Sequence, residues 1–228
     1  IDDITATTGY GDPIQSIFNF SDGERIVGVV SSDQKLHPVV VPDTPSLEDE
    51  SNESDGAKPP FMIAISSAGR TTRVSMASYH EVSTKNGRRF MSIGSNDVVL
   101  GVFASDGTEN VAVTSQRGRA MLFAVTDIPP KSGTVKGVTA MKLDSGDILI
   151  GFCLTRRKRE GLTVRTSRGR ELIIRETSYR VVKRGGKGTP VLKVGQFVDC
   201  DWPTVIMTPS VESDAADNLD VDETEGTE

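Results

Sequence analysis

The sequence of 228 residues contains few of the residues that build disulfide frameworks or metal sites. It has two cysteines, Cys153 and Cys200, and two histidines, His37 and His80, and none of the four stands at the spacing of a CxxC pair or a zinc ligand set. Apolar runs reach only about six residues, against the roughly 20 that a membrane-spanning helix needs. We therefore expect no disulfide, no metal site and no transmembrane segment.

Aromatic residues make up only 5% of the chain, yet apolar residues in total make up 36%, which suffices for the core of one domain. The opening residues 1–4, Ile-Asp-Asp-Ile, form neither the basic nor the apolar part of a secretory signal. The sequence therefore indicates a cytoplasmic protein with one folded domain.

The formal net charge of −6 hides two acidic segments and a basic remainder. Residues 43–58 carry six acids and one base, and residues 211–228 carry eight acids and no base. Without these segments, of net charge −5 and −8, the rest of the chain has a net charge of +7. Their composition favours a flexible acidic insertion over 42–59 and a disordered tail over 210–228. The basic body is the first indication of function, because a positive field attracts polyanions.

Three turn-like sequences recur with a period of about 50 residues. Residues 67–70, 116–119 and 167–170 place their glycines at positions 69, 118 and 169, at spacings of 49 and 51. A β-rich run precedes each glycine and an alternating run follows it. The period predicts an all-β fold, a β-propeller-like pinwheel whose blades are four-stranded units of about 50 residues.

Residues 14–30 match only the second half of such a module. The chain is therefore predicted to hold a half module followed by three full modules. The folded domain is expected to cover residues 1–209, with the acidic insertion inside it and the acidic tail behind it.

The last module contains the segment Val182-Lys183-Arg184-Gly185-Gly186-Lys187-Gly188. It resembles the signature loop of the C-terminal domain of DNA gyrase A: glutamine, then Arg or Lys, Arg, Gly, Gly, Lys or Arg, and Gly. Six of the seven positions agree, and Val182 stands where the family has glutamine. The resemblance covers roughly residues 9–209. Because the loop lies here in the last module rather than the first, the chain is either a C-terminal part of such a domain or a shorter, divergent member.

The resemblance implies a β-pinwheel of a type IIA topoisomerase that wraps duplex DNA and supports ATP-dependent negative supercoiling. The implied partners are duplex DNA, the gyrase B subunit, and the remainder of the A subunit, with no membrane, and the implied location is the cytoplasm, on the nucleoid. ATP and Mg²⁺ would belong to the holoenzyme and the catalytic tyrosine to a preceding domain. This chain alone is therefore expected to hold no cofactor and no catalytic residue.

The signature loop is also suited to DNA on physical grounds, since adjacent glycines flanked by cations can bring backbone N–H groups and positive charge to phosphates. Further arginines recur near the turns of successive modules, as a rim that bends DNA requires. The predicted DNA-binding residues are Lys183, Arg184, Gly185, Gly186, Lys187, Gly188, Arg168, Arg170, Arg117, Arg119, Arg70, Arg73, Arg88 and Arg89. The acidic tail is expected to compete with DNA for this rim.

Two other functions stay open at this point. One is a topoisomerase IV-type C-terminal domain that bends DNA without chiral wrapping, and the other is a propeller-like scaffold whose cations bind acidic proteins. The basic run 156–159 lies between two predicted strands and is either DNA-facing or simply solvated. Phe197 and Trp202 alternate within an apolar strand, which predicts core positions for both.

Overall fold

The computed structural model describes residues 13–30, 57–79, 81 and 87–201. Most of the predicted acidic insertion, the whole predicted tail, both histidines and Trp202 lie outside the described residues. The predictions made for those segments are therefore not tested by the structure.

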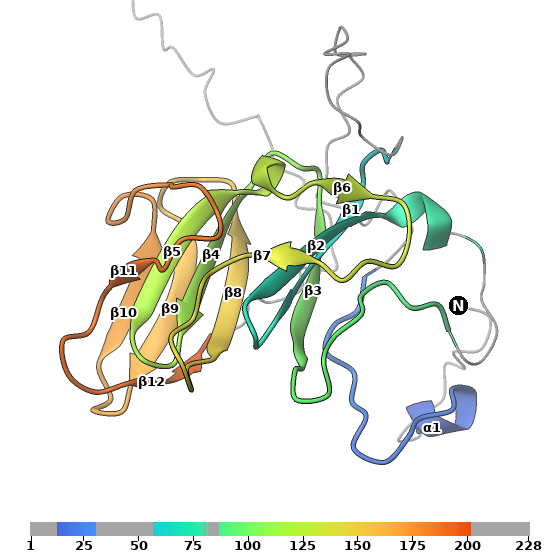
Figure 1. Ribbon diagram of the computed structural model, residues 1–228, viewed down its shortest axis with the longest axis horizontal. Coiled ribbons are helices and arrows are strands. Elements are labelled where there is room, and N and C mark those ends of the chain that lie inside the picture. Colours follow the sequence, from blue (N-terminus) through green and yellow to red (C-terminus); the bar gives the residue numbers. More distant parts are fainter. Residues whose placement is uncertain (1–12, 31–56, 80, 82–86, 202–228) are drawn as a thin grey trace, which may run out of the picture.

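The described chain forms three mainly antiparallel sheets (Figure 1). The first sheet contains β1 (Phe61–Ser66), β2 (Arg70–Ser75), β3 (Val99–Ser105), β6 (Pro130–Lys131) and β7 (Val138–Thr139). The second contains β4 (Asn110–Ser115), β5 (Arg119–Ala124), β8 (Leu149–Thr155) and β11 (Thr189–Pro190), and the third contains β9 (Gly161–Thr166), β10 (Glu171–Arg175) and β12 (Phe197–Cys200). The helical elements are short: α1 (Ile14–Ile17) and the 3₁₀ helices η2 (Met76–Tyr79) and η3 (Val125–Asp127). The predicted all-β class is confirmed.

Each sheet is built on one of the hairpins that the repeated glycines predicted. Gly69, Gly118 and Gly169 have φ values of +80°, +80° and +76°, in the left-handed region that glycine adopts without strain. The third strand of each sheet, β3, β8 or β12, pairs antiparallel with the first strand of its hairpin. The three sheets correspond to the three full modules of the prediction.

The outer strands of the first two sheets come from the following repeat. β7 pairs with β2, with Thr139 opposite Arg70, and β11 pairs with β5, with Pro190 opposite Arg119. Both donated strands lie between the hairpin and the third strand of the next repeat. The period of the sequence predicts how many strands a repeat has, but it does not say which sheet receives each strand. The exchange is therefore a finding of the structure.

Two apolar clusters hold the sheets together. One joins the first and second sheets around Ile63, Phe123 and Phe152, and Phe103 packs edge-on against Phe152 at a ring separation of 5.0 Å. The other joins the second and third sheets around Leu122 and Phe197. Phe197 is fully buried, which confirms its predicted place in the core.

The predicted half module forms α1 followed by chain without an assigned strand over residues 18–30. Its Gly28 nevertheless lies against β3, because a β-carbon built there would stand 3.1 Å from Val102 O. Gly151 on β8 lies in the same way against Cys200 on β12. Residues 26–30 therefore lie against β3 as β8, the third strand of its sheet, lies against β12. Within the described residues they have no hairpin with which to form a ladder.

Candidate nucleic-acid interface

The predicted signature loop, residues 182–188, forms backbone hydrogen bonds with β5 of the second sheet and with residues 140–142, which follow β7 of the first sheet. Val182 N–H donates to Leu122 O at 2.8 Å, and Gly185 N–H donates to Ala140 O at 2.7 Å. Gly186 O accepts a hydrogen bond of 2.8 Å from Lys142 N–H. Gly188 has φ +66°, and a β-carbon there would lie 2.7 Å from Ala120 O, so no other residue fits this approach. Gly188 thus serves close backbone packing against β5, whereas a β-carbon on Gly185 or Gly186 would meet nothing closer than 3.7 Å.

Arg184 fastens this loop with its side chain. Its Nε donates to Asp127 O at 2.7 Å and its Nη1 donates to Thr139 O at 3.0 Å, so the guanidinium joins η3 to β7. The residue is half-buried. Its charged donors are engaged by protein carbonyls, which gives Arg184 a role in the fold that the sequence prediction did not include.

The same kind of contact recurs at the first residue of two hairpin strands. Arg119 donates from Nε to Lys187 O at 2.7 Å and from Nη2 to Gly188 O at 3.1 Å. Arg70, the equivalent residue one repeat earlier, donates to Gly137 O at 3.3 Å. Each arginine holds the strand that the next repeat donates. We call Arg70, Arg119 and Arg184 the clamp arginines.

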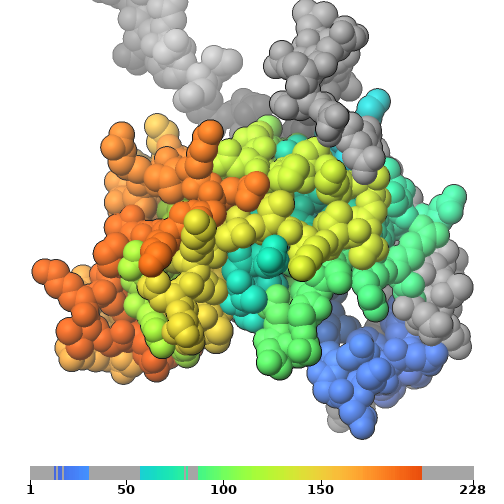
Figure 2. Space-filling view, viewed as in Figure 1, coloured from blue at the N-terminus to red at the C-terminus, as the bar shows by residue number. Residues whose placement is uncertain are grey.

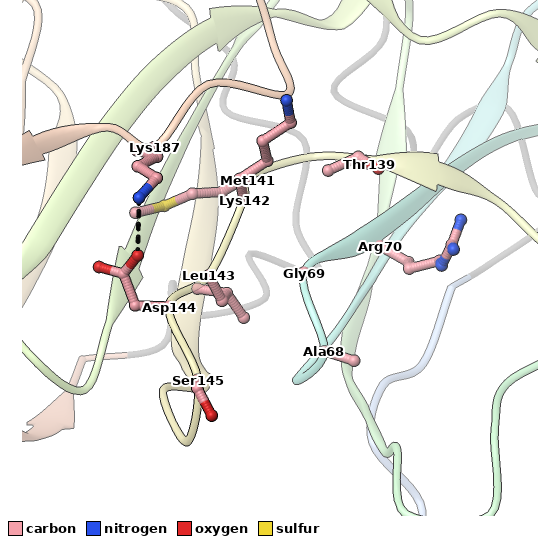
Figure 3. Close-up of a pocket in the computed structure, with 10 residues that line it drawn as sticks. All are labelled: Ala68, Gly69, Arg70, Thr139, Met141, Lys142, Leu143, Asp144, Ser145 and Lys187. Carbon is pink, nitrogen blue, oxygen red and sulfur yellow. Dashed lines mark hydrogen bonds and ion pairs between the residues drawn. The ribbon is translucent and has the colours of Figure 1, made fainter.

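A cleft of about 440 Å³ opens between the turn of the first sheet and the signature loop (Figure 3). Arg70, Lys142 and Lys187 line it together with Asp144. Lys187 Nζ lies 2.9 Å from Asp144 Oδ1, and this hydrogen bond lowers the pKa of the Asp144 carboxyl below its ordinary value. Both partners are largely exposed, so the ion pair is weak enough to open when a phosphate competes for the lysine.

Several predicted cations are exposed and have no ion pair among the described residues: Lys183, Arg89, Arg117, Arg168 and Arg170. Arg88 is exposed but stands 3.8 Å from Glu81 and donates to Ser78 O. Arg73 differs from all of these. Its guanidinium packs 4.0 Å from the centre of the Phe61 ring, and burial lowers the pKa of Arg73. We therefore assign Arg73 to packing in the first sheet.

The strongly basic stretch from 156 to 193 is partly neutralised by the fold. Arg156 forms ion pairs with Asp106 at 3.2 Å and with the buried Glu109 at 3.0 Å. Arg165 faces Glu171, Asp199 and Asp201, and the hydrogen bond to Asp201 is the main cause of its raised pKa. The basic run 156–159 therefore begins with a structural residue, which neither interpretation of that run had predicted.

The sequence prediction missed three exposed lysines: Lys136, Lys142 and Lys193. The signal is present as a second repeat, Lys-Gly-x-x-apolar-apolar-Lys, which covers residues 136–142 and 187–193. In each copy of this repeat, one lysine stands before the donated strand and one stands after it.

Within the described residues, no group of three or more His, Cys, Asp or Glu side chains could hold a metal ion. Burial raises the pKa of the Cys153 thiol to about 12 and that of Cys200 to about 11. Across the same part of the chain, no helix has the length and apolarity to cross a membrane.

Comparison with known sequences identifies the repeat. The family model described as the DNA gyrase C-terminal domain, beta-propeller, matches residues 109–152 and 166–196. The DNA gyrase A protein of Aminobacterium colombiense is 25% identical over 198 residues, which cover 85% of this chain and 21% of that protein. The DNA gyrase A protein of Staphylococcus epidermidis is 23% identical over 144 residues, which cover 63% of this chain and 16% of that protein. The chain thus spans about a fifth of the length of these relatives.

Solved structures share the architecture. The C-terminal domain of DNA topoisomerase IV superposes with a TM-score of 0.68 at 16% identity, over 85% of this chain and 55% of that one. The DNA gyrase A C-terminal domain superposes with a TM-score of 0.59 at 18% identity, over 88% of this chain and 61% of that one. The repeats, the strand arrangement and these matches show that the chain is similar to the C-terminal domains of DNA gyrase A over residues 109–152 and 166–196 and that it shares their β-pinwheel fold.

Proposed function

We propose that this chain binds duplex DNA without sequence specificity and bends and wraps it, as the C-terminal domain of a DNA gyrase A subunit. In the holoenzyme, with the rest of the A subunit, the B subunit, ATP and Mg²⁺, the wrapping supports negative supercoiling. The observation that carries the proposal is the recurrence of exposed cations at equivalent places of successive repeats. These pairs are Arg117 with Arg168, Lys136 with Lys187, and Lys142 with Lys193.

Cations at these places bind the DNA backbone, because side-chain charges that repeat with the fold match the repeating charge of phosphates rather than any base sequence. If about six phosphates are neutralised, the logarithm of the binding constant falls with the logarithm of salt concentration at a slope of about −5. Bending a site of 20–30 base pairs by 40–90° costs on the order of 1–6 kcal/mol. Phosphate contacts made by cations of three successive sheets would offset this cost.

The chain itself performs no chemistry in this proposal. Tyr79 and Tyr179 are half-buried, and Tyr79 O–H donates to Arg89 O at 3.4 Å, an environment in which burial raises the pKa of the phenol. The strand-cleaving tyrosine, ATP and Mg²⁺ belong to other parts of the holoenzyme. Binding to the chromosome would place the protein in the cytoplasm, on the nucleoid.

The test is the affinity for linear duplexes of about 20, 40 and 140 base pairs across a salt series, joined to ligation of nicked plasmid in the presence of the protein. Affinity that rises with length, together with a handed shift in linking number, is the expected result. A Lys142→Ala, Lys187→Ala, Lys193→Ala triple variant should make the salt slope shallower by about 3. Arg25→Ala, which removes an exposed cation from the segment 13–30, is the control and should leave the slope almost unchanged.

A topoisomerase IV-type domain, which bends DNA without chiral wrapping, is the second candidate. Two observations favour it: the TM-score of 0.68 with the C-terminal domain of topoisomerase IV, and Val182 in place of the signature glutamine. Tight, length-dependent binding without a linking-number shift would select this function. Negligible binding at low salt, even after removal of residues 210–228, would refute both and leave the scaffold for acidic proteins.

A further inference from the structure

The third sheet has an outer edge that is open within the described residues, whereas the same edge of the first and second sheets is filled by another strand. β2 is covered by β6 and β7, and β5 is covered by β11, whereas β10 pairs within the described residues with β9 alone. On β5, Leu122 is buried in the cluster between the second and third sheets, while Ile173, its equivalent on β10, is 45% exposed because no further sheet packs on that face within the described residues. A β-carbon on Gly118 would meet Leu192, but one on Gly169 meets nothing within 4 Å.

The two filled edges bind the same kind of segment in the same register. We call residues 137–143 and 188–194 the docking segments. In each, the second and third residues form the donated strand, opposite Thr71 and Arg70 in one case and Ala120 and Arg119 in the other. The fourth and fifth residues donate their N–H groups to the carbonyl of the hairpin glycine, Gly69 or Gly118.

A third copy of this pattern stands at residues 87–93, Gly-Arg-Arg-Phe-Met-Ser-Ile, which we call the donor segment. Its glycine has φ +67°, beside +77° and +66° in the docking segments. Ser92 N–H donates to Val135 O, as Lys142 N–H donates to Gly186 O. Unlike the docking segments, the donor segment pairs with no hairpin within the described residues, and Gly87 faces open space.

Charge distinguishes the donor segment from the two docking segments. The position of Thr71 and Ala120, both buried, is taken on β10 by Glu171. The same register would place Arg88 opposite Glu171, where an opposite-charge pair stabilises strand pairing. Val138 and Thr189, at the place of Arg88, would add no cation beside Glu171, which is paired on its own sheet with Arg165. The third residue of the donor segment, Arg89, would face Arg170 in this register, a pair of like charges that opposes the gain from Arg88. In the structure, Arg88 lies 3.8 Å from Glu81, and Glu171 lies 3.6 Å from Arg165. Both ion pairs are exposed, so each residue can readily exchange its partner.

The donor segment and β10 lie at opposite ends of the molecule, the green coil and the orange strand of Figure 1, and the space-filling view separates the two regions in the same way (Figure 2). One copy cannot join its own two ends in this arrangement. We propose that the open edge of β10 binds the donor segment, residues 87–93, of a second copy of this chain. Such a contact is head-to-tail, so it extends the row of sheets from one copy into the next.

The first test is sedimentation velocity over a range of protein concentrations without DNA, with reversed charges. Glu171→Arg and Arg88→Glu should each raise the dissociation constant about fivefold, and the double variant should restore it. Arg159→Glu, in an exposed loop, is the control for a lost positive charge and should leave association unchanged. A monomer at every concentration, or single variants that behave like Arg159→Glu, would overturn the proposal.

The second test does not depend on charge. A Glu171→Cys variant is mixed under oxidising conditions with an Arg88→Cys variant, and separately with Arg159→Cys. The proposal expects a cross-linked dimer in the first mixture well above its level in the second, because facing residues of paired strands have β-carbons about 5 Å apart. Equal yields in the two mixtures would refute a paired register. Both tests are made without DNA, so their outcome is separate from that of the DNA-binding proposal.

Discussion

Replacing Arg184 and Lys183, neighbours in the signature loop, by alanine should give opposite results. Arg184→Ala removes two charged hydrogen bonds and leaves Asp127 O and Thr139 O without those donors in a half-buried place. Hydrogen bonds to charged groups contribute about 1.5–3 kcal/mol each, and the partial exposure of Arg184 reduces this, so we expect a loss of about 2–4 kcal/mol. With a urea dependence of about 2 kcal/mol per molar, the unfolding midpoint should fall by about 1–2 M.

Lys183→Ala removes an exposed cation that has no ion pair among the described residues, so the unfolding midpoint should not move. Its effect should fall on DNA, where one lost phosphate contact makes the salt slope shallower by about 0.9. Urea unfolding followed by fluorescence and circular dichroism, and DNA binding across a salt series on folded protein, measure the two effects. An Arg184→Ala protein that unfolds at the midpoint of the unmodified protein but loses DNA binding would refute the assignment of Arg184 to the fold.

Three further predictions follow from individual side chains. Arg156→Ala removes the cation that pairs with the buried Glu109 carboxylate and should lower the free energy of unfolding by about 2–3 kcal/mol. This is less than the loss expected for a fully buried pair, because Arg156 is partly exposed. Lys158→Ala, which removes a cation from an exposed pair, should leave the free energy of unfolding unchanged. The pKa of Asp144 is lowered in the fold, so any stability from this group is present above its unfolded pKa and is lost as pH falls through its folded pKa; carboxyl titration by NMR should show the pKa rising toward its ordinary value in Lys187→Ala. Cys153 and Cys200, whose thiol pKa values are about 12 and 11, should react with an alkylating reagent at pH about 8 only as fast as the protein opens, and rapid labelling of the folded protein would contradict their burial.

Much of the fold could be predicted from the sequence because a hairpin is a local structure. The glycines at 69, 118 and 169 mark turns that depend on their own φ values, and the flanking runs alternate as strands do. The exchange of β7 and β11 could not be predicted in this way, because it depends on contacts between residues about 70 positions apart, such as Arg70 with Thr139. The half module shows the same limit, since Ile26-Val27-Gly28 is a strand-like sequence that forms no ladder without a partner.

The cations of the candidate site fall into two groups, those that hold the fold and those that are exposed, for a related reason. Sequence alone identifies cations, and it placed Arg184 and Lys183 in one functional group because they are adjacent in a recognisable loop. The structure separates them by whether a backbone carbonyl lies within reach of the side chain, a property of the neighbouring repeat. Lys142 and Lys193 were missed because they belong to the donated segments, whose importance is visible only once the exchange is known.

This division also connects the fold to the proposed activity. The clamp arginines Arg70 and Arg119 hold each donated strand on the preceding sheet, and the lysines that bracket those strands are exposed on the same segments. One segment therefore fixes how two neighbouring sheets are joined and also carries the charges offered to DNA. Because those charges are tied to the junction between sheets, the direction of the bound duplex would follow the angle between the sheets rather than the conformation of flexible loops. A protein that bends DNA against an elastic cost of several kcal/mol needs this rigidity, since cations on mobile loops would follow the straight duplex instead of curving it.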